Sequence, residues 1–257
     1  MPNIRVAIPS HLVTIPFLFG LKHHTIKDEL VITEKKYPDS VRALLANEVD
    51  VALIPIERLH EINNYQIVSE LCISSQREMQ SILLVINGEI ANLETIYIDK
   101  NQTIAESLIR ILANGFWKCS PSYQPITSKE TLHNLKLGEG ALFVGDEAIA
   151  ESHSFGCTVD LSSEWKKFTG LPLVVAAWVS TKPLPFNFRE QFDEALRFGI
   201  NNIDNAIAEM TFSNDFPKAK VRRYLSHGIS YILDQEKVVS MELFLKLQAK
   251  RQVAFAV

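Results

Sequence analysis

The sequence lacks the features that mark membrane-embedded, secreted and disulfide-bonded proteins. No apolar run approaches the ~20 residues that a membrane-spanning helix needs. The N-terminal residues MPNIRVAIPS contain no basic segment followed by a long apolar run, so we expect no signal peptide. The three cysteines, Cys72, Cys119 and Cys157, are widely spaced and odd in number. This pattern fits a reducing cytosol and offers no metal-ligand spacing, so we expect a cytoplasmic protein with no membrane partner.

Clustered positive charge is also missing. The 257 residues include 26 Lys and Arg against 30 Asp and Glu, a formal net charge of -4, and the basic residues are spread along the chain. A nucleic-acid-binding surface needs clustered positive charge, so nucleic acid is not an expected partner. The length fits one large domain or two smaller lobes, and nothing in the composition indicates an oligomeric state.

The familiar catalytic and cofactor motifs are absent. The chain contains no Walker loop and no GxGxxG, HExxH, GxSxG or CxxC pattern. Any chemistry must therefore come from scattered polar groups at the ends of strands.

What is present is a distinctive segment from Asp160 to Trp178, DLSSEWKKFTGLPLVVAAW. Its apolar end, Leu171–Val179, is rich in Val and Ala and about as long as one buried strand. A strand that apolar must be covered on both faces, so we expect it in the middle of a sheet. Gly170 and Pro172 mark a turn at its entrance, where Thr169 offers a hydroxyl. That turn is either an ordinary connection or part of a binding site.

The N-terminal part of the chain predicts a parallel sheet. Strands are expected at Arg5–Pro9, Leu30–Thr33 and Asp50–Ile56. A helix with Pro in its first turn begins near Ile15, and an amphipathic helix covers Ser40–Ala46. The resulting β-α-β-α-β order is typical of parallel α/β folds.

The middle of the chain predicts a second α/β unit, and the part after Trp178 predicts only helices. The strands expected in the middle part are Tyr65–Ile73, Ser81–Ile86, Thr95–Asp99, Tyr123–Ile126 and Ala141–Val144. The expected helices are Thr103–Leu112, Ser128–Leu135, Phe188–Met210, Pro217–Leu233 and Val238–Ala249.

This order resembles the two-lobed, type II periplasmic-binding-protein-like α/β fold, with a helical C-terminal tail. We expect residues 1–86 and 174–257 to form the first lobe and residues 87–173 the second, with crossings near Ser81–Ile90 and Thr169–Trp178. Ligands in such folds occupy a cleft at the C-terminal ends of strands and the N-termini of helices. Unpaired N–H groups at helix N-termini bind carboxylates there.

Several polar residues lie where such a site is expected, and each has a simpler structural alternative. His11 follows the first strand and could act as an acid or base near neutral pH, or be an exposed or capping residue. Asp146 could act as a base or cap the helix after it. Glu57 could face the site or lie in the first turn of a helix. The candidate substrate-binding residues, which could instead be loop hydroxyls, turn glycines or caps, are Ser10, Thr14, Ser81, Gln102, Thr103, Gly145, Thr169 and Gly170.

The order of motifs resembles the chorismate dehydratase family of the futalosine route to menaquinone, over nearly the whole chain. The run DVALIPIERL from Asp50 is similar to that family's D-x-(A/G)-L-(I/V)-P strand, and FVGD, ending at Asp146, to its I-G-D turn. The segment from Asp160 is similar to its DL-x-x-EW-x-x-x-TGLPFVFA-x-W pattern. SHLVTIP from Ser10 and MQSILL from Met79 follow its S-Y-L-N-T-x-P opening and its V-x-S-V-L-L strand.

The resemblance implies that the protein is a hydro-lyase that removes water from chorismate, giving 3-[(1-carboxyvinyl)oxy]benzoate. A ring proton and a hydroxyl leave, and the ring becomes aromatic. The implied partner is a small dicarboxylate, which needs anchors for two carboxylates, a base for the ring proton and help for the departing hydroxyl. Aromatisation supplies the driving force, so the resemblance implies no metal or redox cofactor.

Three departures from the family pattern fall on the expected ligand surface. Val13 replaces an Asn that lies in the cleft in that family and is thought to take part in the chemistry, and valine can neither donate nor accept a proton. The family's Ser-Arg-Thr-Ser motif is Gln102-Thr103-Ile104-Ala105 here, and the Gly of the loop before Ser81 is missing.

Two explanations of these departures stay open. In the first, the protein is still the dehydratase: His11 or another residue replaces the lost Asn, and the N–H groups of Gln102 and Thr103 hold a carboxylate. In the second, the fold is retained in a paralogue that binds another small acid or no longer catalyses. We take the dehydratase as the first choice.

Overall fold

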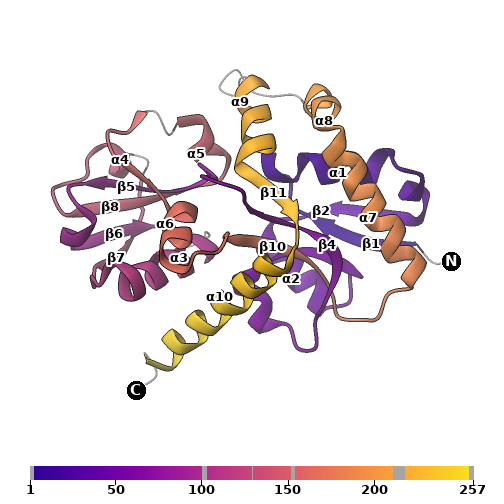
Figure 1. Cartoon of the computed structure of the whole chain (residues 1–257), viewed down its shortest axis with the longest axis horizontal. Helices are drawn as coiled ribbons and strands as arrows, with labels where there is room; N and C mark the ends of the chain where they lie inside the picture. Colours follow the sequence, from indigo (N-terminus) through magenta and orange to yellow (C-terminus); the bar gives the residue numbers. More distant parts are fainter. Residues whose placement is uncertain (1–2, 100–102, 129, 152–153, 211–217, 255–257) are drawn as a thin grey trace. The chain divides into compact units, whose positions relative to one another are not determined.

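The structure is a computed structural model that describes residues 3–99, 103–128, 130–151, 154–210 and 218–254 (Figure 1). The chain forms two compact units. Unit 1 comprises Met1–Ser74 and Val174–Val238, and unit 2 comprises Ser75–Leu173 and Val239–Val257.

This division differs from the expected one at two places. The first boundary follows Ser74 instead of Ile86, because Ser75 belongs with Leu173: the Ser75 N–H donates to the Leu173 carbonyl at 2.8 Å, and the Leu173 N–H donates to Ser75 Oγ at 2.8 Å. The chain from Val239 onward belongs to unit 2, because Phe244 packs against Trp165 there.

Unit 1 is built on a six-stranded sheet with the order β11-β4-β10-β3-β1-β2. Its strands are β1 (Ile4–Ile8), β2 (Leu30–Glu34), β3 (Val51–Pro55), β4 (Gln66–Ser75), β10 (Val174–Ser180) and β11 (Ile229–Ile232). Strand β1 pairs in parallel with both β2 and β3, which confirms the predicted β-α-β-α-β start. The helical segments of unit 1 are η1 (Leu12–Thr14), α1 (Ile15–His23), η2 (Thr25–Glu29), α2 (Tyr37–Leu45), η3 (Ile56–Glu61), α7 (Phe186–Asn201), α8 (Ile203–Glu209), α9 (Lys218–Arg223) and η7 (Tyr224–Gly228).

The apolar strand β10 lies inside this sheet, as the sequence predicts. It pairs antiparallel with β3 on one side and with β4 on the other, and all seven of its residues are buried. Trp178 packs against Phe17 of α1 and Phe192 of α7. A continuous apolar run is therefore required here, because both faces of the strand are covered.

Helices α1 and α7 run side by side in unit 1 (Figure 1). Two glycines make their close approach possible. A Cβ atom added to Gly20 would lie 2.0 Å from the Ala195 carbonyl oxygen, and one added to Gly199 would lie 1.8 Å from the Pro16 carbonyl oxygen. The two backbones therefore touch directly, with no room for a side chain at either position.

The prediction of one helix over Pro217–Leu233 is wrong. Helix α9 ends at Arg223, and after the π-helical turn η7 the chain enters strand β11, which lies beside β4. The Leu233 N–H donates to the Glu70 carbonyl at 2.8 Å, so these residues complete the sheet edge. Ile229 and Tyr231 are buried and alternate with more exposed neighbours, which is the period of a strand. The predicted helix over Phe188–Met210 is interrupted at Asn202, between α7 and α8.

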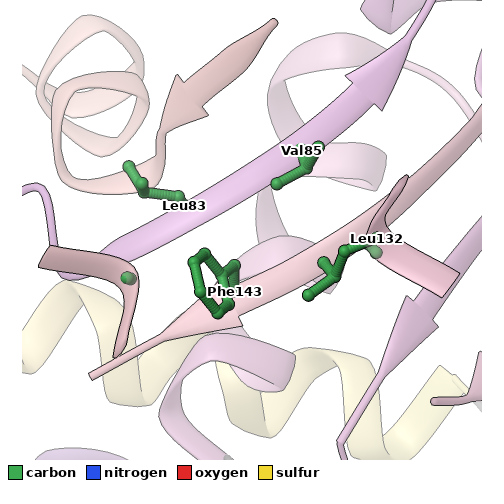
Figure 2. Packing of buried hydrophobic residues seen from close by; sticks show 6 residues of the cluster. Leu83, Val85, Leu132 and Phe143 are labelled. Atoms are coloured by element: carbon green, nitrogen blue, oxygen red, sulfur yellow. The ribbon is translucent and has the colours of Figure 1, made fainter. Parts of the chain in front are cut away.

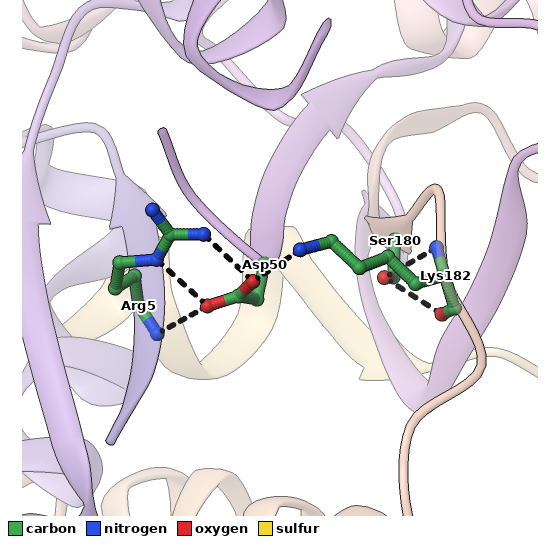
Figure 3. A network of polar contacts seen from close by, with 4 residues as sticks. All are labelled: Arg5, Asp50, Ser180 and Lys182. Atoms are coloured by element: carbon green, nitrogen blue, oxygen red, sulfur yellow. Dashed lines mark hydrogen bonds and ion pairs between the residues drawn. The ribbon is translucent and has the colours of Figure 1, made fainter. Parts of the chain in front are cut away.

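Asp50 joins the starts of β1 and β3 to the end of β10 (Figure 3). Its carboxylate accepts hydrogen bonds from the Arg5 backbone N–H, from Nε and Nη2 of the Arg5 guanidinium, and from Lys182 Nζ, all at 2.8–3.0 Å. The hydrogen bond from the Arg5 side chain is the main cause that holds the pKa of Asp50 well below its usual range. The Asp50 side chain is only 14% exposed, so this network is worth more than an ordinary surface ion pair.

We expect Asp50→Asn to lower the free energy of unfolding by about 1.5–3 kcal/mol at pH 7. Because folding lowers the pKa of Asp50, its stabilisation is fully present above the unfolded-state pKa of about 4 and is lost as the pH falls through the folded-state value. The difference in the free energy of unfolding between wild type and variant should therefore become smaller below about pH 4. Urea unfolding at several pH values would measure it. Asp204→Asn is the control, because the Asp204–Arg222 pair is more than 60% exposed on both sides. An equal effect of both substitutions would contradict the prediction.

Unit 2 is built on a five-stranded sheet with the order β7-β6-β8-β5-β9. Its strands are β5 (Ile82–Asn87), β6 (Thr95–Ile98), β7 (Ser122–Pro125), β8 (Glu139–Val144) and β9 (Thr158–Asp160). Its helical segments are η4 (Ile90–Asn92), α3 (Thr103–Leu112), η5 (Ala113–Trp117), α4 (Glu130–His133), α5 (Asp146–Glu151) and α6 (Leu161–Thr169). Helix α10 (Gln235–Ala254) begins in unit 1 and continues in unit 2.

One hydrophobic cluster of unit 2 lies on one face of the β5–β8 pair (Figure 2). The cross-strand partners Leu83 and Phe143 are buried there, as is Val85. Leu132 of α4 packs on the same cluster. Each strand contributes two residues, two positions apart, to this cluster: Leu83 and Val85 from β5, and Ala141 and Phe143 from β8. This alternation sets the register of the two strands beside each other.

Helix α6 was not among the expected elements. Asp160 is its N-cap and accepts a hydrogen bond from the Ser163 N–H at 2.9 Å. Leu161 and Trp165, four residues apart, are fully buried. Gly170 ends the helix with a left-handed φ of +78°, a conformation that favours glycine. The most distinctive part of the sequence is therefore a capped helix followed by the central strand.

Candidate functional site

In unit 1, polar side chains gather at the carboxyl ends of the parallel strands β1, β2 and β3. Ser10 and His11 follow β1 and are exposed. Glu34 is the last residue of β2, and Glu57, which is 1% exposed, follows β3. In open α/β sheets, ligands bind outside the carboxyl ends of the strands, so this edge is the candidate site of unit 1.

The loop between β1 and α1 is held by the Thr14 hydroxyl. Thr14 Oγ1 lies 2.6 Å from the Pro9 carbonyl oxygen and 2.8 Å from the His11 carbonyl oxygen, and it accepts a hydrogen bond from the His11 N–H at 3.2 Å. Thr14 is fully buried. Its hydroxyl therefore fixes the backbone on either side of Ser10, and in this structure it contacts the loop itself.

His11 and Ser10 each contact a neighbouring element of unit 1. The His11 ring stacks on the ring of Tyr37, the first residue of α2, with the ring centroids 5.7 Å apart and the planes 27° apart. The side chain of Ser10 forms a hydrogen bond with Glu34, and this bond is the main cause that lowers the pKa of the Glu34 carboxyl. An imidazole can take or give a proton near neutral pH, so this edge carries one group capable of general acid or base catalysis.

Val13 lies in η1 within the same loop and is 9% exposed. It is one of a run of buried residues from Leu12 to Leu18 that anchor the loop and α1 on the sheet. The position that carries Asn in the resembled family thus holds an apolar, mostly buried side chain here.

In unit 2, Ser81, Gly145 and Asp146 come together at one end of the β5–β8 pair. Ser81 directly precedes β5 and Gly145 directly follows β8, and the Gly145 N–H donates to the Ser81 carbonyl oxygen at 2.7 Å. Gly145 has a φ of +83°, in the left-handed region that favours glycine, and this explains the glycine at this turn. Lack of space is not the reason, since a Cβ atom there would meet nothing within 4 Å. Asp146 begins α5 and is half-buried.

The segment Gln102–Ala105, which aligns with the Ser-Arg-Thr-Ser motif of the resembled family, lies at the start of helix α3 from Thr103 onward. Strand β6 is parallel to β8, so the chain leaves both strands at the same edge of the sheet. Helix α3 follows β6 and begins at Thr103, as the sequence predicts. Gln102 lies outside the described residues.

Thr169 and Gly170 have a local role at the end of α6. The Thr169 hydroxyl donates to the Trp165 carbonyl oxygen at 2.8 Å and accepts from the Leu171 N–H at 3.1 Å. The Gly170 N–H donates to the Lys166 carbonyl oxygen at 2.8 Å. These contacts form the turn into β10, which is the simpler of the two roles that the sequence left open.

Three residues at these two edges were not singled out as site residues from the sequence: Tyr37, Glu34 and Asp160. Tyr37 and Glu34 give no motif signal, because their importance depends on the pairing of β1 with β2. Asp160 had a signal, since an Asp followed by apolar Leu161, Trp165 and Phe168 at helical spacing predicts an N-capped helix.

The described part of the chain contains no group of three or more His, Cys, Asp or Glu side chains arranged to hold a metal ion. Within the same residues, no helix combines the length and the apolar character needed to cross a bilayer.

Comparison with known proteins gives a family and a fold. The model of the menaquinone biosynthesis family matches residues 4–250. No curated protein sequence matches the chain. Among solved structures, a protein from Archaeoglobus fulgidus is similar with a TM-score of 0.76 at 16% identity, with 98% of each chain covered.

Two binding proteins with related folds are also similar. The periplasmic aliphatic sulphonate binding protein of Escherichia coli has a TM-score of 0.68 at 12% identity, covering 98% of this chain and 88% of that one. The alkanesulfonate-binding protein of Xanthomonas axonopodis pv. citri has a TM-score of 0.62 at 15% identity, covering 96% and 94%. At such identities the likeness establishes the fold alone, and it confirms the predicted periplasmic-binding-protein-like architecture. With its family model matched from residue 4 to residue 250, the chain belongs to the menaquinone biosynthesis family.

Proposed function

We propose that the protein is a cytosolic hydro-lyase of menaquinone biosynthesis that converts chorismate to 3-[(1-carboxyvinyl)oxy]benzoate and water. The observation that carries the proposal is the family match over residues 4–250, together with motifs from Ser10, Asp50, Met79 and Asp160 that resemble the chorismate dehydratases. The geometry supports it, because each unit gathers polar groups of these motifs at one edge of its own sheet.

The reaction needs a group that takes the ring proton and a group that helps the hydroxyl leave. We propose His11 and Asp146 for these proton transfers. His11 lies on a loop whose backbone is hydrogen-bonded to the buried Thr14 hydroxyl, and its ring stacks on the ring of Tyr37. Removal of the ring proton with departure of the hydroxyl forms the aromatic ring, and the proton and the hydroxyl leave as water.

The carboxylates of the substrate need hydrogen-bond donors. In unit 1 we propose the Ser10 hydroxyl, with Thr14 holding the loop in place. In unit 2 we propose the hydroxyl of Ser81 and the backbone around Gly145, together with Thr103 at the start of α3 and Gln102 before it in the sequence. Helix α3 has ten residues, and the N–H groups of its first turn have no partner within the helix. For Thr169 and Gly170 we propose an indirect contribution, as the cap that ends α6 before β10.

A second candidate is a small-acid-binding protein that does not catalyse. The buried, apolar Val13 favours it, because the resembled family places a polar side chain at that position. The names of two proteins with similar folds describe the binding of sulphonates, which supports a role in binding a small acid.

Incubation of the purified protein with chorismate separates the two candidates. Product is followed by mass and by aromatic absorbance. Formation of the carboxyvinyloxy-benzoate at a rate proportional to protein concentration supports the dehydratase. A folded protein that forms no product, but whose unfolding temperature rises with chorismate or another small dicarboxylate, supports the binding protein.

We expect Val13→Asn to raise the turnover of chorismate about tenfold or more, because a polar group near developing charge is worth several kcal/mol in an active site. Steady-state rates of wild type and variant would measure the gain. Val13→Ala is the control, since it also removes the valine side chain but adds no polar group. A turnover that Val13→Asn leaves unchanged would show that residue 13 does not limit the reaction.

A further inference from the structure

We propose that Asp160 and Ser162 are positioning residues for the binding site of unit 2. They hold the loop from Arg77 to Gln80 in the one conformation that presents Ser81 beside the Gly145 turn. This inference rests on the proposed function, because it assigns the two residues a role in substrate binding through Ser81.

The contacts that hold the loop are direct hydrogen bonds. The Gln80 N–H donates to Asp160 Oδ2 at 2.7 Å, and the Met79 N–H donates to Ser162 Oγ at 3.1 Å. Ser162 Oγ also lies 3.3 Å from the Arg77 carbonyl oxygen, and its hydroxyl donates to Asp160 Oδ1. Two side chains at the start of α6 therefore accept hydrogen bonds from two backbone N–H groups of one short loop.

The loop needs such support because of its backbone conformation. Gln80 has a φ of +59°, in the left-handed region that residues with a Cβ rarely adopt. The stretch from Ser74 to Gln80, SSQREMQ, contains no glycine that would adopt this conformation easily. The hydrogen bond from Gln80 to Asp160 thus stabilises an unfavourable backbone geometry directly before a proposed substrate-binding residue.

The same contacts connect the loop to the rest of the proposed site. Ser81 follows Gln80, and its carbonyl oxygen accepts the Gly145 N–H at 2.7 Å. Asp160 is the cross-strand partner of Leu83 in the β5–β9 pair, and Leu83, in β5, follows Ser81 by two residues. Displacement of the loop would therefore move Ser81 and the turn that leads into Asp146.

Burial makes water a poor substitute for these bonds. Ser162 is 1% exposed, and Met79 and Ser81 are 2% and 6% exposed. Removal of the Ser162 hydroxyl would leave the Met79 N–H without its acceptor in a buried place. The loop would then move to find another partner, because a buried N–H is rarely left unsatisfied.

A suitable variant separates this role from the role of Asp160 as N-cap. Asn caps helices about as well as Asp, so Asp160→Asn can keep the bond from the Ser163 N–H. Asn has one acceptor oxygen in place of two, so it cannot also accept from Gln80 in the same orientation. Ser162→Ala removes the second contact, and Ser163→Ala is the matched control, because its hydroxyl makes none of the contacts above.

The experiment measures kcat and KM for chorismate, the unfolding temperature, and hydrogen exchange of the Met79, Gln80 and Ser81 amides. For Asp160→Asn and Ser162→Ala we expect kcat/KM to fall on the order of tenfold or more, because small displacements of a positioned group have large effects. Amide exchange at residues 79–81 should become faster. The unfolding temperature should stay within a few degrees of that of Ser163→Ala.

A second substitution tests the mechanism of positioning. Gln80→Gly in the Asp160→Asn background should restore part of the lost kcat/KM, since glycine adopts the left-handed conformation without a Cβ clash. A role of Asp160 in helix capping alone predicts no such rescue.

Failure of the inference and failure of the proposed function look different. If the wild type neither converts nor binds chorismate, the proposed function is wrong and the inference falls with it. If the wild type is active but both variants match Ser163→Ala in kcat/KM and in amide exchange, the dehydratase stands and the positioning role is wrong. Faster exchange with unchanged kinetics would also overturn the inference, because the loop would then be held without serving the substrate.

Discussion

Replacement of Gly199 by alanine is expected to lower the free energy of unfolding by about 3 kcal/mol or more, at the upper end of what overpacking does. The added Cβ would lie 1.8 Å from the Pro16 carbonyl oxygen and 2.8 Å from the Gly20 nitrogen. Both are backbone atoms, so no side chain can rotate away to relieve the clash. Helices α1 and α7 would have to separate, and α1 follows directly on the loop that carries His11.

Urea unfolding followed by circular dichroism would measure the effect. Gly156→Ala is the matched control, because a Cβ atom at Gly156 would meet nothing within 4 Å and its φ is not in the left-handed region. Gly20→Ala should resemble Gly199→Ala, since its Cβ would lie 2.0 Å from the Ala195 carbonyl oxygen. Equal midpoints for the Gly156 and Gly199 variants would show that the two helices are not in backbone contact.

Replacement of His11 by glutamine is expected to lower the turnover of chorismate on the order of 10²- to 10⁴-fold, the range for loss of a general acid or base. Glutamine keeps a polar side chain of similar length but cannot take up a proton near neutral pH. Because His11 is exposed, the circular dichroism spectrum and the unfolding temperature should stay close to those of the wild type.

His24→Gln is the control for this substitution. His24 lies in the same unit and also contacts an aromatic ring, that of Phe198, but it follows the C-terminal end of α1. The control should keep the wild-type turnover. A His11→Gln enzyme as active as the control would remove His11 from the proposed chemistry and leave Asp146 as the proposed proton-transfer group.

The parts of the fold that depend on local periodicity could be predicted. Strand β10 is a continuous apolar run, and a strand with that composition must be covered on both faces. Helix α3 begins and ends where its apolar spacing and its polar start indicate. The β-α-β-α-β order of the N-terminal part follows from alternation of short apolar runs with amphipathic ones.

The parts of the fold that depend on pairing partners far along the chain could not be predicted from the sequence. Ile229–Ile232 is too short to identify itself as a strand, and it becomes one because the edge of β4 offers backbone partners. The boundary at Ser74 depends on Ser75 bonding to Leu173, nearly a hundred positions away. The same limit applies to Tyr37 and Glu34, which reach the Ser10–His11 loop only because β1 pairs with β2.

By itself, then, the sequence determined the fold class, the central strand and the loops that bear the candidate residues, because hydrophobic period and turn chemistry are local properties. The tertiary structure alone decided which of those residues meet. It brought Ser81 into hydrogen-bond contact with Gly145, and Thr169 into contact with the last turn of α6. It also brought Asp160 and Ser162 into contact with the loop before Ser81. These contacts join residues up to 83 positions apart, and only the packing of the folded chain brings such residues within hydrogen-bond distance.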